Sequence, residues 1–436
     1  MLSRQHFDTS VPTVLVRLDR NPFHHGTLGA ARSLGRAGIP VHAVIESSTS
    51  PVARSRYVRS ARARPGSSSS AELCALLGRV GDEITDSPSH PVLAVPLDDV
   101  SALALAARRR SGLAPRFLLP EQTEEQLLRV ADKAALAETC ADLGLPHPRT
   151  ELPEGADEAA AMAWSLGLPV VAKWSRPWLL PAGGGLRSTT IVGSLAEVRE
   201  LYARTPEAGS RLLLQEMLPD GRDLDWFFHG YVDSAGRCAT GATGRKERSW
   251  PDGAGLTASG RWTVNPTVER TARELLAALG YRGVCDLDFR LNRATGAYHL
   301  LDFNPRAGAQ FRLFTDPEGL DVVRALHLDL TGRPVPPVSP AYGRRFVVEN
   351  YAALSLLASP RRRYAPEPDG SRRTEYAWFA ADDPLPALAM GRAWLAHLLR
   401  KAWRALRRAL GARRSGAALT GAAPPARTST DQLTRR

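Results

Sequence analysis

The stretch that decides the fold is "CDLDFRLNRATGAYHLLDFN", residues 285–304. Two segments with alternating apolar and polar residues, 285–291 and 298–304, flank the short connection "NRATG". Asn, Thr and Gly in such a connection are typical of a hairpin loop. The stretch therefore predicts a β-hairpin, and a slip of one residue in either strand would scramble its alternation.

Folding this hairpin at Thr295 places Asp288 opposite Asp302 and Asp286 opposite Asn304. Directly opposed side chains share a face of the sheet, so one face carries all four polar residues. The other face is predicted to be apolar and to consist of Leu287, Phe289, Leu291, Leu301 and Phe303.

Three carboxylates and an amide on one face repel each other unless a cation neutralises them. All-oxygen ligands suit a hard ion, and Mg²⁺ usually takes one or two carboxylates together with substrate phosphates. The competing interpretation is a solvated face whose acids point at water. Arg306, just beyond the hairpin in "NPRAG", favours the cation, because a guanidinium beside such a cluster suits phosphate or acyl-phosphate oxygens.

The first 112 residues alternate between strand and helix patterns. Residues 13–18 and 39–46 predict buried strands on either side of a helix, and 91–99 predicts a further strand before a helix that ends at Gly112. Such alternation favours a doubly wound parallel sheet. No Gly-x-Gly-x-x-Gly follows the first strand, so a dinucleotide site is not expected.

Bulk composition narrows the class of protein. The net charge is +12, but residues from Arg361 onward hold 16 Lys plus Arg against 6 Asp plus Glu, whereas the preceding 360 hold 41 against 39. A nearly neutral body does not indicate nucleic-acid binding. Four scattered cysteines without paired spacing, and a polar start without a secretory signal, lead us to expect a cytoplasmic protein with reduced thiols.

With these motifs in order, residues 12–335 resemble the ATP-grasp superfamily, in particular its carboxylate–amine ligases. The resemblance lies in Asp288 followed by Asp302, Asn304, Pro305 and Arg306, and in the segments "ADKAALAETCADLGLPHPRT", "PVVAKWS", "GGGLRST" and "LLLQEMLPDGRDLD". It implies a preparatory α/β domain, then two α+β lobes that hold ATP between them. Asp302 is a departure, because the family mostly has Glu there.

The resemblance also implies site residues. Mg²⁺, with Mn²⁺ as an alternative, would be held by Asp288, Asp302 and Asn304. ATP phosphates would meet Lys133 and Lys173 under a glycine loop, Gly183, Gly184 and Gly185. Adenine would be bound by backbone groups around Glu216, Met217 and Leu218, and the ribose by Asp223. The expected catalytic or substrate-facing residues are Arg306, Lys246 and Arg248.

Two further polar pairs lie near the ends of predicted strands. His24 and His25 invite a metal interpretation, but a capping role or a place in a substrate loop fits adjacent histidines better. Asp98 and Asp99 end a strand at the carboxyl edge of the first sheet, where ligands bind in open α/β sheets. A structural cap explains these two acids at least as well.

The tail contains an amphipathic pattern over residues 388–410. At helical spacing, Leu395, Leu399 and Leu406 occupy one half of the helix, while Arg404 and Arg408 occupy the other. Basic and leucine faces with Trp394 and Trp403 at the borders match a helix lying in a membrane interface. A helix docked on the protein's own surface or on a partner is an equal alternative.

We therefore expect five parts: 1–118, a preparatory α/β domain; 119–340, the ATP-grasp unit; 341–383, an extension; 384–411, the basic helix; and 412–436, a disordered tail. The expected activity is ADP-forming ligation of a small-molecule carboxylate to an amine through an acyl phosphate, with no nucleic-acid partner. The alternative is a non-catalytic ATP-binding scaffold or regulator that the tail tethers to a membrane. A homodimer and a peripheral location at the inner membrane face are left open.

Overall fold

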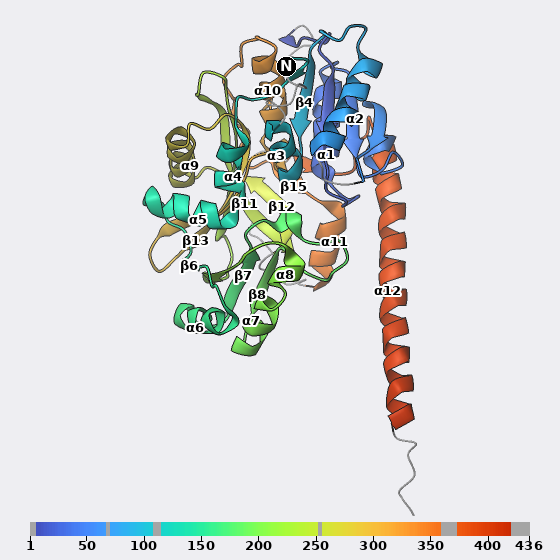
Figure 1. The fold of residues 1–436 in the computed structure, drawn as a ribbon. Coiled ribbons are helices and arrows are strands. Elements are labelled where there is room, and N and C mark those ends of the chain that lie inside the picture. Colours follow the sequence, from blue (N-terminus) through green and yellow to red (C-terminus); the bar gives the residue numbers. More distant parts are fainter. Residues whose placement is uncertain (1–5, 67–69, 108–114, 252–254, 359–372, 420–436) are drawn as a thin grey trace, which may run out of the picture. The chain divides into compact units, whose positions relative to one another are not determined.

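The structure is a computed structural model that describes residues 6–66, 70–107, 115–251, 255–358 and 373–419. Residue contacts divide the chain into two units, Met1–Ala389 and Met390–Arg436. The first unit is an α/β body with three sheets, in agreement with the predicted fold class (Figure 1). The finer division of this body at residues 118 and 340 remains a prediction.

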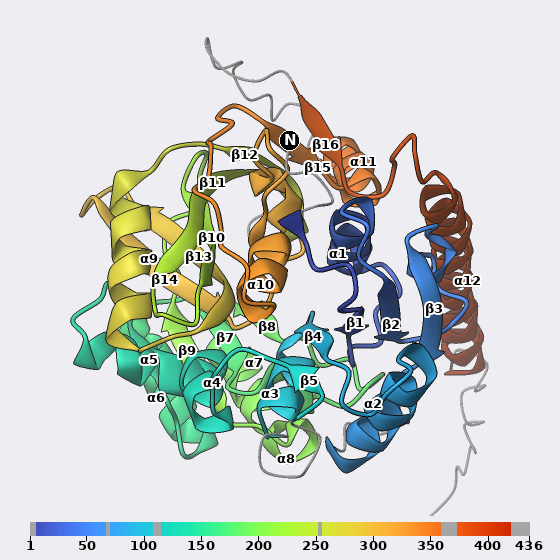
Figure 2. The ribbon, with the colours of Figure 1, turned by 90° about the horizontal axis from the view of Figure 1, so that it is seen from above.

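The first sheet is parallel, with the strand order β3-β2-β1-β4-β5. Its strands are β1 (Thr13–Val16), β2 (Val41–Ile45), β3 (Val58–Ala63), β4 (Val92–Pro96) and β5 (Phe117–Leu118). Its helices are α1 (His25–Arg36), α2 (Ser70–Ile84) and α3 (Asp99–Ala107). Figure 2 shows α1 on the opposite side of this sheet from α2 and α3, so the doubly wound arrangement is confirmed.

Burial explains which of these strands could be predicted. β1 and β2 are buried along their whole length, as expected for central parallel strands covered on both faces. β3 is an edge strand with the sequence "VRSARA" and no fully buried residue. We predicted no strand there, because its sequence lacks an apolar run, and we assigned residues 62–70 to a loop.

The helical run after Thr123 consists of two helices, α4 (Glu124–Ala131) and α5 (Lys133–Asp142). Thr123 opens α4 with a capping box completed by Gln126. Asp132 has an extended backbone that ends α4, and its carboxylate caps α5 by accepting from the Ala134 backbone N–H at 3.0 Å. This break, which we did not predict, starts a new helix at Lys133.

The second sheet is small, with the order β6-β9-β7-β8. Its strands are β6 (Thr150–Glu151), β7 (Val170–Trp174), β8 (Thr189–Val192) and β9 (Leu212–Glu216), and its helices are α6 (Ala156–Leu166), α7 (Leu195–Tyr202) and α8 (Thr205–Ala208). The helices pack on the sheet through a separate apolar cluster that includes Ala163, Trp174 and Val198. This lobe therefore has its own core.

The third sheet has seven strands in the order β14-β13-β10-β11-β12-β15-β16. They are β10 (Asp225–Val232), β11 (Cys238–Trp250), β12 (Leu256–Trp262), β13 (Gly283–Asn292), β14 (Ala297–Asn304), β15 (Arg345–Val347) and β16 (Thr374–Tyr376). Its helices are α9 (Pro266–Ala278), α10 (Val322–Leu330) and α11 (Glu349–Ala358). β9 and β10, which follow each other along the chain, thus belong to different sheets.

The segment after Tyr376 is fastened to the first domain by a buried ion pair. Arg32 in α1 has no exposed surface, and its Nε donates to Asp383 Oδ2 at 2.9 Å. The same guanidinium donates to the Trp378 carbonyl at 2.7 Å, and Ser55 Oγ donates to Asp383 Oδ2 at 2.7 Å. The chain beyond the seven-stranded sheet is therefore tied back to α1.

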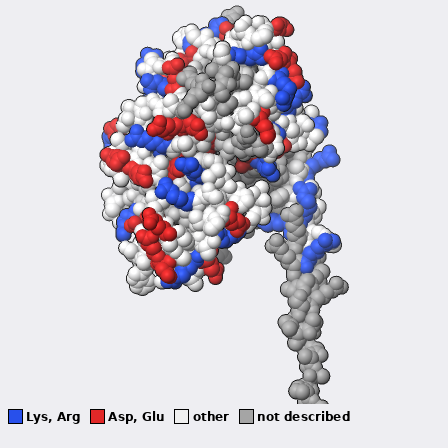
Figure 3. All heavy atoms as spheres, in the orientation of Figure 1, with Lys and Arg blue, Asp and Glu red and all other residues white. Residues whose placement is uncertain are grey.

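The last described element is α12 (Leu385–Leu419), which extends past Gly411, where we expected the helix to end. Residues 420–436, the larger part of the expected disordered tail, lie outside the described residues. In the described part of the chain, no helix is both long and apolar enough to cross a bilayer. Figure 3 shows acidic and basic side chains interspersed on the visible face of the body, in keeping with its nearly neutral charge.

Candidate active site

The register of the β13–β14 hairpin agrees with the prediction at its functional end. Asp288 pairs with Asp302, and Asp286 pairs with Asn304. A register shift then occurs after Asp288, so that Phe289 pairs with Leu300. The prediction that Leu301 faces the core was therefore wrong, because the bulge puts Leu300, 1% exposed, into the core instead.

A cavity of about 280 Å³ lies between the four-stranded sheet and this hairpin. β7 contributes Lys173, β9 contributes Glu216, and the start of α5 contributes Lys133. The hairpin contributes Asp288, Asp302 and Asn304 to the same wall. Elements more than 100 residues apart thus bring the expected phosphate-binding lysines and metal-binding oxygens into one cavity.

The two lysines meet the hairpin directly. Lys133 Nζ forms an ion pair with Asp302 Oδ1, and Lys173 Nζ donates to the Leu301 carbonyl at 3.0 Å. Burial lowers the pKa of Lys173 to about 8, opposed by the attraction of Asp302 and reinforced by the repulsion of Lys133. Both cations are therefore concentrated where the phosphates of a nucleotide would lie.

Among the expected metal ligands, Asp288 is a buried carboxylate whose negative charge has no direct partner in the described part of the chain. Burial, with the nearby charges of Asp286 and Asp302, raises the pKa of Asp288 to about 6 although Lys246 opposes the shift. Among the described residues, no hydrogen bond or ion pair to the Asp288 carboxylate is present, and no group of three or more His, Cys, Asp or Glu could hold a metal. Two carboxylates and an amide oxygen fit a divalent cation whose remaining ligands are phosphates and water.

A second cavity, of about 450 Å³, adjoins the first. The two share Asp99, Lys246, Asp288, Asp302 and Asn304 in their walls. The first domain adds residues from the loop before α1 and from the start of α1, namely Arg17, Asp19, Asn21, His24 and His25. The expected metal ligands therefore stand at the boundary between a nucleotide-sized cavity and a second polar cavity.

Close packing at two glycines holds the turn after the hairpin against α1 and β10. A Cβ at Gly26 would lie 2.8 Å from the Ala309 Cα, and one at Gly308 would lie 2.0 Å from His229 Cε1. Side chains at either position would push α1 or the turn after Arg306 away. His24 caps α1 by accepting from the Thr27 N–H, so its predicted capping role is confirmed.

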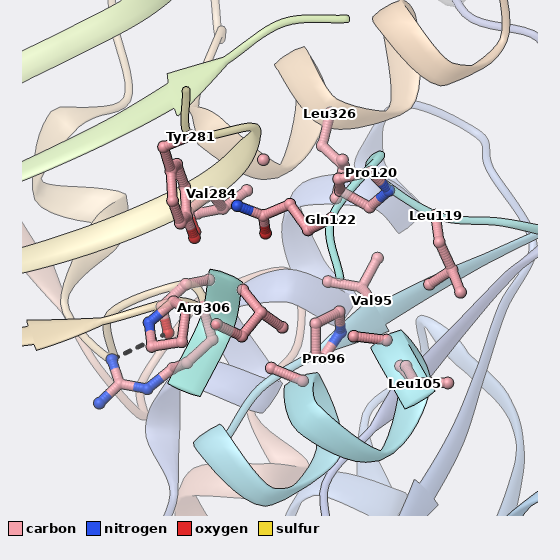
Figure 4. Close-up of a pocket in the computed structure, with 16 residues that line it drawn as sticks. Val95, Pro96, Leu105, Leu119, Pro120, Gln122, Tyr281, Val284, Arg306 and Leu326 are labelled. Carbon is pink, nitrogen blue, oxygen red and sulfur yellow. Dashed lines mark hydrogen bonds between the residues drawn. The ribbon is translucent and has the colours of Figure 1, made fainter. Parts of the chain in front are cut away.

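Arg306 lies in the wall of the second cavity between two acids. Its Nη1 donates to Asp286 Oδ2 at 2.7 Å, and its Nε lies 3.6 Å from Asp99 Oδ1. Figure 4 shows it beside a smaller, largely apolar cavity of about 40 Å³ that Val95, Leu119 and Tyr281 help to line. The apolar side chains of its wall back the stem of Arg306.

Other predicted residues lie outside both cavities. None of Gly183, Gly184 and Gly185 lines either one, although Ser188, just beyond them, lines both. Arg204 instead donates to the Gly184 carbonyl at 2.6 Å. Met217 also lies outside the lining, between Glu216 and Leu218, which are both part of it.

Arg248 and Asp223 are displaced for identifiable reasons. A bulge in β11 breaks the strand alternation between Lys246 and Arg248, so only Lys246 lines the cavities, and Arg248 Nη1 donates to the Ser355 carbonyl at 3.5 Å. Asp223 precedes β10 with a φ of 63° and lies 3.3 Å from Arg245. Asp225, two residues on, lines the nucleotide-sized cavity in its place.

The sequence prediction missed several residues that line these cavities. Arg290 Nε donates to Asp225 Oδ1 at 2.7 Å, and both side chains face the nucleotide-sized cavity. Asp225 on β10 is directly opposite Arg290 on β13, and this contact can be predicted only when the pairing of these two strands is known. Asp98 lines the second cavity and accepts from the Leu18 N–H at 2.7 Å, and Asp99 is part of both cavity walls.

No protein-family profile matches the chain. Over 216 residues it is 24% identical to the N-terminal section of the carbamoyl phosphate synthase large chain of Methanopyrus kandleri. The match covers 46% of this chain and 36% of that relative, so the chain spans about a third of its length. A match of this extent shows shared sequence and does not carry the activity of the whole relative over to this chain.

Solved structures show a broader likeness. The ADP complex of N5-carboxyaminoimidazole ribonucleotide synthetase gives a TM-score of 0.58 at 12% identity, over 85% of this chain and 91% of that one. The biotin carboxylase domain dimer of the Hydrogenobacter thermophilus 2-oxoglutarate carboxylase, with MgADP, ADP and bicarbonate, gives 0.54 at 17% identity, over 76% and 72%. At these identities the likeness shows the fold, and it confirms the ATP-grasp architecture that the motifs predict.

Proposed function

We propose that this ATP-grasp-fold chain is an ATP-dependent ligase that joins a carboxylate to an amine and releases ADP and phosphate. One observation carries the proposal: Asp288, Asp302 and Asn304 stand in the wall shared by the two cavities. A nucleotide in the first of these cavities, of about 280 Å³, would present its terminal phosphate at this wall. A carboxylate in the larger cavity would meet that phosphate there.

The residues that we assign to nucleotide binding are Lys133 and Lys173 for the phosphates and Asp225, in place of Asp223, for the ribose. Asp225 is held by Arg290 within the cavity wall. The backbone N–H of Glu216 already donates to the Arg149 carbonyl at 2.9 Å, which leaves Met217 and Leu218 as the nearby donors for adenine. Mg²⁺, held by Asp288, Asp302 and Asn304, would supply charge neutralisation of the phosphates.

The first step forms a bond between a carboxylate oxygen and the γ-phosphorus of ATP and breaks the bond to the β-phosphate, so that ADP leaves. Lys133 and Lys173 stabilise the charge on the transferring group. The amine then attacks the acyl carbon, inorganic phosphate leaves, and the amine loses a proton. Arg306 faces the second cavity and would stabilise the oxyanion that forms during this attack.

The second cavity also suits an amine substrate. Its wall contains the carboxylates of Asp19 and Asp99. Arg17 and Arg306, which also line it, each form ion pairs with acids, and these acids neutralise much of the positive charge of the two guanidinium groups. His25 is 6% exposed, and neither of its ring nitrogens has a hydrogen-bond partner among the described residues. Burial lowers its pKa to about 3, so it stays neutral and adds no positive charge to this wall.

The residues that we assign to the phosphates, the metal and the oxyanion favour an enzyme over an ATP-binding scaffold. The test is product analysis with MgATP and pools of carboxylates and amines, comparing wild type with Asp302→Ala. We expect ADP and phosphate to form only with a substrate pool, and a loss on the order of 10²–10³ in the variant. The matched control is Asp157→Ala, whose carboxylate is 93% exposed on α6 and should not affect turnover.

Other products would contradict specific parts of the proposal. AMP and pyrophosphate would contradict the acyl-phosphate route. Tight MgATP binding without turnover, across pools that include amino acids, dipeptides and bicarbonate, would instead support the scaffold.

A further inference from the structure

Helix α12 combines length with a one-sided charge composition. Its 35 residues contain no Asp or Glu. They contain eight basic residues: Arg392, Arg400, Lys401, Arg404, Arg407, Arg408, Arg413 and Arg414. Such a helix gains nothing from the internal opposite-charge pairs that usually stabilise exposed helices. Its charge is therefore available to an anionic surface.

The same helix presents an apolar stripe that the described residues leave exposed. Leu388 is 64% exposed, Leu395 59%, Leu399 62% and Trp403 56%. At 100° per residue these four side chains fall within an arc of about 80°. The stripe extends over about four turns and is interrupted by Arg392, which falls within the same arc; a single accidental leucine would not produce it.

A second copy of the helix is a poor occupant for this stripe. A coiled-coil seam through Leu388, Leu395 and Leu399 would have Arg392 at another core position and would continue at Ala402 and Ala409. Small residues would leave that seam thin in its second half. Two copies would also bring together helices whose charged side chains are all positive, so the two helices would repel each other.

A nucleic acid is also a poor occupant. Phosphates would satisfy the arginines but would leave the leucine stripe in water. A bilayer containing anionic lipid meets both needs, because leucines enter the acyl boundary while arginines reach headgroup phosphates. Trp403, with the Arg407 guanidinium 5.1 Å from its ring centroid, has the amphipathic character that favours the interface.

We propose that α12 binds in the headgroup plane of a bilayer that contains anionic lipid. It lies on the membrane and does not cross it, in keeping with the absence of a spanning helix among the described residues. The proposal is independent of the ligase assignment, since it rests only on residues 385–419. It concentrates the active site near a membrane surface whatever the substrates are.

The test is flotation of the full-length chain with vesicles of phosphatidylcholine containing about 30% phosphatidylglycerol, beside vesicles of phosphatidylcholine alone. We expect binding only to the anionic vesicles, with partitioning reduced roughly tenfold or more when salt rises from about 0.1 M to 0.5 M. Leu395→Glu with Leu399→Glu should abolish flotation. Arg400→Gln with Lys401→Gln should weaken it about tenfold or more.

Matched controls are Leu357→Glu, an 81% exposed leucine on α11, and Arg270→Gln, an exposed arginine on α9. Both should float like wild type, and circular dichroism and thermal denaturation curves that match wild type would show that every variant is folded. Absence of flotation by the wild-type chain would overturn the proposal. So would equal binding to neutral vesicles, or a dimer in solution that Leu395→Glu dissociates.

Discussion

Lys133 and Asp302 form a direct ion pair across the wall of the nucleotide-sized cavity. Asp302 is one of the three oxygen donors that we assign to Mg²⁺, and Lys133 is one of the two cations that we assign to the phosphates. MgATP would therefore replace this pair by a lysine–phosphate and a carboxylate–metal contact. In the structure Lys133 and Asp302 are thus paired with each other, whereas in the nucleotide complex each would contact the ligand assigned to it.

This relationship predicts that Asp302→Asn uncouples nucleotide binding from turnover. The substitution frees Lys133 and removes a negative charge facing the phosphates, so metal-free ATP should bind as tightly as to wild type or tighter. Turnover with Mg²⁺ should fall on the order of 10²–10³. Calorimetry in EDTA and an ADP-release assay measure the two effects, and activity within tenfold of wild type would contradict the assignment.

The lowered pKa of Lys173 predicts a pH dependence of ADP affinity. Phosphate binds the protonated lysine, so affinity should be constant below about pH 7.5 and should weaken as pH rises through about 8, by up to tenfold per unit. Lys173→Arg should remove this dependence, because arginine stays charged throughout that range. Dissociation constants measured between about pH 7 and 9 check it, and the same slope in Lys173→Arg would assign the dependence to another group.

His25 is expected to act on the amine rather than on ATP. His25→Ala removes part of the wall that positions the amine in the second cavity, so KM for the amine should rise about tenfold while the ATP dissociation constant stays unchanged. His90→Ala is the control, since His90 contacts the Ser10 carbonyl away from both cavities. A matching loss of ATP affinity in His25→Ala would mean that the cavity had collapsed.

The Arg32–Asp383 pair predicts a large effect on stability. Asp383→Ala leaves a wholly buried guanidinium without its carboxylate and should lower the free energy of unfolding by about 3–5 kcal/mol. Asp382→Ala, next in the chain, removes a partly exposed pair with Arg36 and should cost about 1 kcal/mol or less. Urea denaturation of the two variants checks the contrast, and similar losses would mean that the buried contact contributes no more than a surface one.

The functional end of the hairpin could be predicted because strand alternation has a period of two and both strands carry it. Alternation gives no signal for a bulge, so the shift that puts Leu300 in the core and the break between Lys246 and Arg248 were both missed. Asp223 and Asp225 share one parity, and only the left-handed backbone of Asp223 decides which of them enters the cavity.

The contact between Arg32 and Asp383 had no local signature either, because it joins positions 351 residues apart. The same holds for Asp225 and Arg290, which meet only through the pairing of β10 with β13. Sequence patterns pointed to the residues that we assign to phosphate and metal, because these residues lie in short motifs. Tertiary contacts supply the walls around them.

The most direct test of the central claim is transfer of heavy oxygen from a labelled carboxylate substrate to inorganic phosphate. An acyl-phosphate route requires the carboxylate oxygen that attacks ATP to leave with the phosphate when the amine attacks. We therefore predict one labelled oxygen per phosphate released, detected by mass spectrometry and absent with Asp302→Ala. Unlabelled phosphate from wild-type turnover, or label found in AMP, would contradict the proposed ligase mechanism.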